Sequence, residues 1–343
     1  MSDVLPAWQQ GPFEALVAVH ARGRLPHALL LDGPDGWGAR IFARALARYL
    51  LELPQNPTVA PATGARDGEQ AVDQDLLAHR DARIVRRSPS PTSGKLRAQI
   101  TVDEVRALGE FLVRTAGAGG ARVAIVELAE DLNMNAANAL LKRLEEPGEG
   151  THLLLVTAQS SRVLATVRSR CQRVVLPPGT PGQARAWLEA RLPESSASVA
   201  GTERDACDML LALAGGAPLR ALDFAARDAL PLAQAVDAAL DGGPIEPLTG
   251  EKLRLETDAA RARAALVLEL LYRALAARVR SVVAEGEQPP HGPTLQRWQR
   301  LLDGVLRAQR RLQSAANPNV TLLLEELLIG IAARGAAATG PTR

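Results

Sequence analysis

Five short apolar runs that alternate with helical patterns constrain the fold of this chain more than any other feature. The runs lie at residues 27–33, 82–87, 121–128, 151–158 and 172–178. Segments with helical spacing lie between them, for example at residues 37–51 and 133–146. Strands separated by helices of this length indicate a parallel sheet with helices on both faces. We therefore expect an α/β domain over residues 1–179.

The rest of the chain lacks strand-like runs. A small helical module is expected around the segment GGAPLRAL at residues 215–222, and three long amphipathic stretches follow near residues 251–285, 293–315 and 319–334. The middle stretch repeats apolar residues on one face at helical spacing: Leu295, Trp298, Leu301, Leu302, Val305 and Leu306. An all-α region is therefore expected after the sheet.

The composition narrows the class of protein. A length of 343 residues suggests two or three domains, and a formal net charge of +2 does not demand a nucleic-acid partner. Aromatic residues make up 3% of the chain, which argues against base stacking as its main activity. Two cysteines imply no disulfide framework, and neither a membrane span nor a signal peptide is evident. We expect a soluble, cytoplasmic protein with no membrane partner.

The segment GPDGWGAR follows the first strand as a phosphate-binding loop would. Such a loop reads G-x-x-x-x-G-K-[ST], where the Lys neutralises phosphate oxygens and the hydroxyl holds Mg²⁺. The chain keeps the glycines Gly33, Gly36 and Gly38 but has Ala39 and Arg40 in place of the Lys and the hydroxyl. A backbone cradle for phosphate and an ordinary strand–turn–helix connection are equally good interpretations of this segment alone.

A second degenerate motif lies at the end of the segment VAIVEL, residues 123–128. P-loop ATPases place a Mg²⁺-binding Asp at the end of such a strand, followed by a Glu that orients water. Here Glu127 holds the first position and Leu128 the second. A leucine cannot polarise water, so a second part of an ATPase site is missing. A strand that simply ends in an acidic residue is the alternative interpretation.

The triplet Ser169-Arg170-Cys171 lies between a short helical segment and the last strand. Taken alone, three residues are weak evidence for a function. Cys171 suits a small buried apolar position, and Arg170 suits a surface ion pair.

Four segments then form an ordered series: NALLK at residues 138–142, LEEP at 144–147, THLLLVTA at 151–158 and VRSRCQR at 167–173. Their spacing resembles that of bacterial clamp-loader AAA+ subunits, and most of all the delta-prime family of DNA polymerase III. The resemblance extends to the loop, to GGAPLRAL and, more loosely, to NPNVTLLLEELL at residues 317–328.

This resemblance implies a fold and a role. The fold would be an α/β P-loop AAA+ domain over residues 1–179, a small helical lid over 180–230, an all-α collar over 231–334 and a disordered tail over 335–343. The chain would act as a stator in a ring with gamma/tau and delta subunits. That ring loads the beta clamp onto primed DNA, and any DNA contact of this chain would be modest and independent of sequence.

The resemblance also implies roles for single residues. Arg170 would be an arginine finger that reaches a neighbour's ATP, with Ser169 and Cys171 supporting it. Thr157 falls at the family's first sensor position, and Arg220 lies near the second. No nucleotide is expected at this chain's own degenerate loop, so both sensor-like residues would be structural, and ATP would bind only at the neighbouring subunit.

Many members of the family carry a four-cysteine zinc module after the first helix of this domain. The corresponding stretch here, ELPQNPTVAPATGARDGEQ, contains no cysteine, and His79 follows it without evident partners. A structural zinc site needs about four Cys or His ligands. We therefore expect no zinc and no other metal, and we expect His79 to be an ordinary residue.

Three alternative functions remain open at this point. The chain could be an atypical ATP-binding ATPase in which Arg40 replaces the Lys. It could be the gamma/tau motor, against which the broken loop argues. It could also be a helical DNA-binding or adaptor protein unrelated to replication.

Overall fold

The structure is a computed structural model that describes residues 5–55, 59–61, 71–90, 96–113, 120–192, 203–249, 258–284, 293–313 and 319–335. It contains two compact units, Met1–Arg191 with Gly216–Ala221 and Leu192–Gly215 with Leu222–Arg343. The division into three domains stays a prediction. The expected disordered tail, residues 335–343, lies outside the described residues except for Gly335, which ends a helix.

The first unit contains the predicted parallel sheet. The five strands are β1 (Ala28–Asp32), β4 (Ala82–Val85), β5 (Arg122–Val126), β6 (Thr151–Thr157) and β7 (Gln172–Val175). Their order is β4-β5-β6-β1-β7, and every neighbouring pair is parallel. The predicted α/β class with a helical C-terminal region is confirmed.

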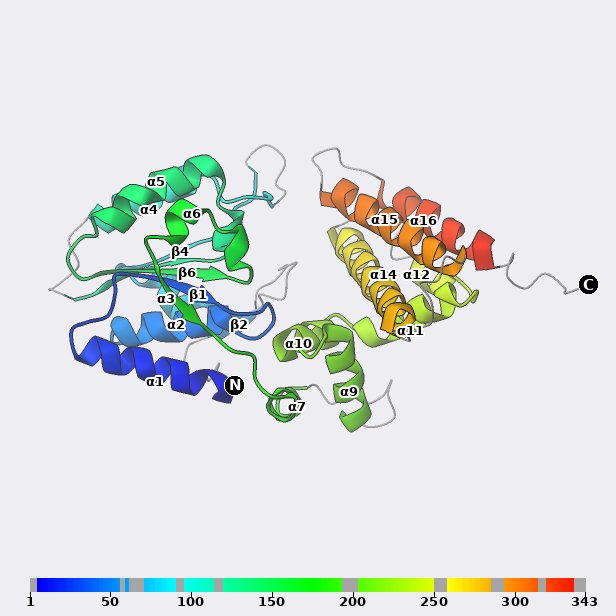
Figure 1. Cartoon of the computed structure of the whole chain (residues 1–343), viewed down its shortest axis with the longest axis horizontal. Helices are drawn as coiled ribbons and strands as arrows, with labels where there is room; N and C mark the ends of the chain where they lie inside the picture. The colour runs from blue at the N-terminus through cyan, green and yellow to red at the C-terminus, as the bar shows by residue number, and fades with distance from the viewer. Residues whose placement is uncertain are drawn as a thin grey trace, which may run out of the picture. The chain divides into compact units, whose positions relative to one another are not determined.

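Helices cover both faces of this sheet (Figure 1). The helices α1 (Ala7–Ala21), α2 (Ala39–Leu50) and α3 (Gln74–Ala78) lie on one face. The helices α4 (Val102–Val113), α5 (Met134–Glu145) and α6 (Ala165–Arg168) lie on the other. Since successive strand residues point to opposite faces, Leu29 and Leu31 pack in the first layer and Leu30 packs in the second.

One sequence-based expectation is wrong. The polar, proline- and glycine-rich composition of the stretch 53–75 predicts a loop, but the stretch includes the strands β2 (Val59–Pro61) and β3 (Ala71–Asp73), which pair antiparallel. Helix α3 then begins at Gln74. Residues 56–58 and 62–70 of this stretch lie outside the described residues. The two strands have three residues each, which is too short for a recognisable strand pattern in a stretch rich in proline and glycine.

Every described element after β7 is a helix. The elements are α7 (Pro181–Glu189), α9 (Glu203–Ala214), α10 (Pro218–Ala226), α11 (Ala229–Leu240), α12 (Glu246–Thr249), α14 (Asp258–Ala284), α15 (Pro293–Gln313) and α16 (Val320–Gly335). In the second unit α14 packs against α11, α15 and α16. Among the described residues no single helix is long and apolar enough to cross a membrane, and only one bent pair, Arg204–Ala214 with Pro218–Ala226, has the required length and composition.

Candidate functional site

The degenerate loop, Glu127 and Thr157 meet at the carboxyl edge of the sheet. The loop follows β1, Glu127 follows β5, and Thr157 ends β6, which lies between those two strands. The Gly33 N–H donates to the Thr157 carbonyl over 3.1 Å. Parallel strands end at one edge of a sheet, so the fold itself places these positions together.

Glycine is required at two positions of the loop. Gly36 and Gly38 have φ angles of 77° and 95°, which other residues rarely adopt. A Cβ atom on Gly36 would lie 2.9 Å from the Ala217 Cβ, at the start of the α10 region. Gly38 is the N-cap of α2, and Ala39 is the first residue of that helix. The loop therefore keeps the backbone shape that the glycines predicted, with other chain segments packed closely against it.

Helix α1 contacts the loop directly. Trp8 Nε1 and Gln9 Nε2 both donate to the Trp37 carbonyl oxygen, over 3.1 and 2.9 Å. The Trp37 N–H donates to the Pro34 carbonyl over 3.2 Å instead of pointing to a ligand. Trp8 also packs edge-on against Trp37 and Trp187. No local pattern in the sequence links residues 8 and 9 to the loop, so the sequence does not predict these contacts.

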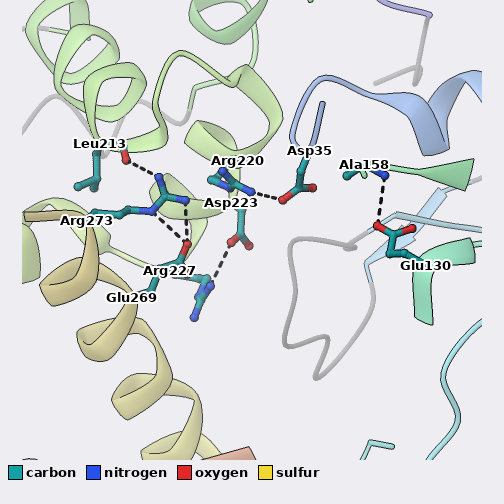
Figure 2. A network of polar contacts seen from close by, with 9 residues as sticks. All are labelled: Asp35, Glu130, Ala158, Leu213, Arg220, Asp223, Arg227, Glu269 and Arg273. Carbon is teal, nitrogen blue, oxygen red and sulfur yellow. Dashed lines mark hydrogen bonds and ion pairs between the residues drawn. The ribbon is translucent and has the colours of Figure 1, made fainter. Parts of the chain in front are cut away.

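Arg220, which lies on α10, also contacts the loop. Its Nη2 forms an ion pair with the Asp35 carboxylate, and Figure 2 shows the two side chains directed toward each other. The Leu219 N–H donates to the Gly36 carbonyl over 3.2 Å. The second sensor-like residue is thus held by an acidic residue of the loop itself.

Glu127 is held by a partner that the sequence did not reveal. Its side chain is 1% exposed, and its Oε1 accepts from Arg44 Nη2 over 2.8 Å. Arg44 lies on α2, one turn after Arg40. A guanidinium therefore lies against the carboxylate that would bind Mg²⁺ in an active site. The only signal in the sequence was the spacing of the two arginines along one helix.

Thr157 and its neighbours form internal hydrogen bonds. Thr157 is buried, and its Oγ1 accepts from the Gln159 N–H over 3.1 Å. The Ala158 N–H donates to Glu130 Oε1 over 3.2 Å, as Figure 2 shows. Leu128, where a catalytic Glu would be expected, adopts a left-handed conformation with a φ of 56°. The segments beyond β5 and β6 are thus tied to each other by protein groups.

Arg40 contributes to a shift in the pKa of Asp131. Burial raises the pKa of Asp131, opposed in part by Arg87, whose Nε lies 3.6 Å from the carboxylate. Glu130 raises that pKa further, whereas the charges of Arg162 and Arg40 lower it. Arg40 thus adds positive charge to this edge of the sheet.

The triplet Ser169-Arg170-Cys171 follows α6. Ser169 Oγ donates to the Thr166 carbonyl over 3.1 Å, and Cys171 packs against the core beside α4 and α5. Burial raises the pKa of Cys171 to about 11, so this thiol stays protonated at neutral pH. The Arg170 side chain is 35% exposed and pairs with Glu145. Of the three residues, Arg170 alone presents a charged group at the surface.

Metal ligands do not cluster in the part of the chain that the structure describes, where no group of three or more His, Cys, Asp or Glu residues could hold an ion. His79 Nδ1 accepts from the Asp81 N–H over 3.2 Å. The absence of zinc stays a prediction, because much of the stretch 53–75 lies outside the described residues.

Comparison with known proteins identifies relatives. A family model described as "DNA polymerase III, delta subunit" matches residues 8–180. The DNA polymerase III subunit delta′ of Escherichia coli K12 is 34% identical over 339 residues, which are 94% of each chain. The Pseudomonas aeruginosa subunit delta′ is 40% identical over 64% of this chain, a match that spans 61% of that protein. A solved gamma subunit-related protein from Thermotoga maritima is 20% identical with a TM-score of 0.49, over 94% of this chain and 99% of that one.

Proposed function

The chain belongs to the DNA polymerase III delta′ family, and from this premise we propose that it is the non-hydrolysing stator of a sliding-clamp loader. Its Arg170 would complete the ATP site of a neighbouring motor subunit. One contrast carries the proposal. The carboxylate at this chain's own Mg²⁺ position is buried against Arg44, whereas the Arg170 side chain is 35% exposed at the surface.

Several observations support the absence of ATP hydrolysis by this chain. Ala39 supplies no charge for phosphate oxygens, and Leu128 supplies no group that orients water. Arg44 neutralises Glu127, and the loop carbonyls of Gly36 and Trp37 accept hydrogen bonds from other segments. The chain would therefore need no metal or nucleotide of its own, and ATP would bind at the neighbouring subunit.

A guanidinium suits the role of a group supplied in trans. It is always charged, and its planar fork meets phosphate oxygens in pairs. The neighbours would be gamma/tau and delta subunits, and the ring would act on the beta clamp and primed DNA in the cytoplasm. Arginine fingers contribute on the order of 10³–10⁵ in rate in well-studied phosphoryl-transfer enzymes.

The test is the DNA- and clamp-stimulated ATPase of the complex rebuilt with cognate gamma, delta and clamp. Arg170→Ala should lower the rate by on the order of 10³ while the complex still elutes intact. Arg168→Ala is the matched control, because Arg168 is an exposed arginine on the preceding helix that donates to the Ser160 carbonyl. An unchanged rate with Arg170→Ala in an intact complex would reject the trans role.

Isothermal titration of the isolated chain with ATP and Mg²⁺ tests the other half of the proposal. We expect no heat of binding, because protein groups already occupy the surroundings of the loop. Tight binding followed by turnover would favour an atypical ATPase instead.

A further inference from the structure

We propose that Glu145 is a positioning residue for Arg170, which holds the guanidinium so that it meets the neighbour's phosphate already oriented. This inference rests on the proposed function, since it concerns the same finger. Glu145 is the last residue of α5 in the segment LEEP, and it lies 25 residues before Arg170 in the sequence. Nothing about that spacing predicts the contact.

The contacts fix one edge of the guanidinium. Arg170 Nε and Nη2 both donate to Glu145 Oε1, over 2.7 and 2.5 Å. On the other terminal nitrogen, Nη1 donates to the Thr166 carbonyl over 3.0 Å. A fourth and longer contact joins Nη1 to Ser169 Oγ over 3.5 Å. Two helices therefore determine the plane of the fork.

These contacts leave donors for a ligand. Each terminal nitrogen of a guanidinium carries two N–H groups. Nη2 uses one of them for Glu145, and Nη1 uses one for the Thr166 carbonyl and holds the other only weakly, to Ser169 Oγ. The second N–H of Nη2 and the weakly held N–H of Nη1 are therefore the donors left for two phosphate oxygens.

The two anchors of this arrangement are rigid. Leu144, the residue before Glu145, and Val167, three residues before Arg170, are both fully packed in the core between the sheet and α4 to α6. An arginine that is free in solution must lose rotamer freedom when it binds phosphate, and prior ordering removes that cost. A fixed backbone with an ion pair to Glu145 supplies such ordering.

The ion pair should matter little for folding. The Glu145 and Arg170 side chains are 51% and 35% exposed, and pairs this accessible to water contribute little to stability. Orientation is a different matter, because small misplacements of a catalytic group lower rates by up to about 10²-fold. Loss of Glu145 should therefore lower turnover without unfolding the chain.

The experiment measures kcat and KM for ATP in the rebuilt complex with Glu145→Ala, Glu145→Gln and Arg170→Ala. Glu145→Ala should lower kcat by about tenfold or more and leave KM unchanged, since the finger acts on charge in the transition state. Glu145→Gln keeps an acceptor oxygen for Arg170, so this variant should retain most of the wild-type rate. Glu146→Ala is the control, because it removes the adjacent exposed carboxylate, which does not contact Arg170.

Combining the variants separates the two proposals. In a chain that already carries Arg170→Ala, Glu145→Ala should cause no further loss. If Arg170→Ala lowers the rate but Glu145→Ala leaves it unchanged or raises it, only the positioning role is wrong. Equal losses from Glu145→Ala with and without Arg170 would also overturn it. If Arg170→Ala itself has no effect, both proposals fail.

Discussion

At the scale of single residues, the pair Arg44–Glu127 places a guanidinium against a carboxylate that is buried at the edge of the sheet. Glu127 is 1% exposed, so its charge must be compensated inside the protein. Arg44 contacts only one of its oxygens, and Oε2 is buried without a hydrogen-bond partner. Charge pairing with Arg44 therefore offsets part of the cost of burying this group.

Arg44→Met should destabilise the α/β unit by about 3–5 kcal/mol, because it leaves a buried carboxylate uncompensated. Urea unfolding followed by tryptophan fluorescence measures this loss, since Trp8, Trp37 and Trp187 all lie in that unit. The double variant Arg44→Met/Glu127→Gln should recover much of it. A loss below about 1 kcal/mol for the single variant would mean that the pair is not important for folding.

A second residue makes stability depend on pH. The pKa of His152 is lowered from 6.5 to about 4, mainly by burial and also by the nearby His20 and His27, while a hydrogen bond to the Pro26 backbone opposes the shift. The unfolded chain therefore binds this proton before the folded chain does. Stability is unaffected by His152 above pH 6.5 and falls as the pH drops from 6.5 towards 4, by up to about 1.4 kcal/mol per pH unit.

His152→Gln should reduce this pH dependence. The free energy of unfolding is compared at pH 7.5 and pH 5 in wild type and variant. The difference between the two pH values should be smaller in the variant, because its side chain does not titrate. Carboxylates that titrate in the same pH range affect wild type and variant alike. If the free energy of unfolding changes equally with pH in both proteins, the pH dependence comes from these carboxylates and not from His152.

Much of the site was predictable from single residues, but its partners were not. Ala39, Arg40 and Leu128 depart from an ATPase motif, so the sequence alone predicts loss of hydrolysis. Arg44, Gln9 and Glu145 act through contacts across 83, 28 and 25 residues of sequence. Such contacts depend on which helices pack together, and residue types alone do not encode that.

At the scale of elements, Arg48 contacts both ends of the stretch 53–75. Arg48 lies on α2 with its side chain 2% exposed. Its Nε donates to the Pro54 carbonyl over 2.5 Å, and its Nη2 lies 3.2 Å from Asp75 Oδ2. One buried guanidinium thus bonds to both sides of the segment that contains β2 and β3.

Arg48→Met should remove both contacts and speed proteolytic cleavage within residues 55–75. Since it removes a buried charged donor that makes both hydrogen bonds, the cost in stability should be about 1.5–3 kcal/mol. Limited proteolysis read by mass spectrometry locates the cleavage, with Arg83→Met as a control on β4. Treatment with a chelator should change neither protein, because no zinc is expected. A chelator that accelerated cleavage of the wild-type chain would contradict that expectation.

Elements were predictable where periodicity was strong. All five strands of the main sheet and the helices α2, α4 and α5 match apolar runs or helical spacing in the sequence. The sequence does not predict helix α1, because Gly11 and Pro12 lie within it and both residues disfavour helix interiors. The packing of Phe13 against Phe42 and Tyr49 stabilises α1 despite its poor propensity.

At the scale of the whole molecule, helix α16 of the second unit exposes large apolar side chains. Leu322 and Ile329 on α16 are 63% and 58% exposed. They are seven residues apart, about two helical turns, so they share one face of the helix. Leu323, Leu324 and Leu328, by contrast, are buried. An apolar face beside a packed core is typical of an interface between subunits.

The pair Leu322→Ser/Ile329→Ser should therefore block assembly with the gamma and delta subunits without changing the melting temperature of the isolated chain. Size-exclusion chromatography of the mixed subunits measures assembly, and circular dichroism measures the melting temperature. Leu77→Ser is the matched control, since Leu77 is 48% exposed but lies on α3 of the α/β unit. Normal assembly of the double variant would mean that other faces hold the ring together. A lowered melting temperature would instead show that these side chains support the fold of the second unit.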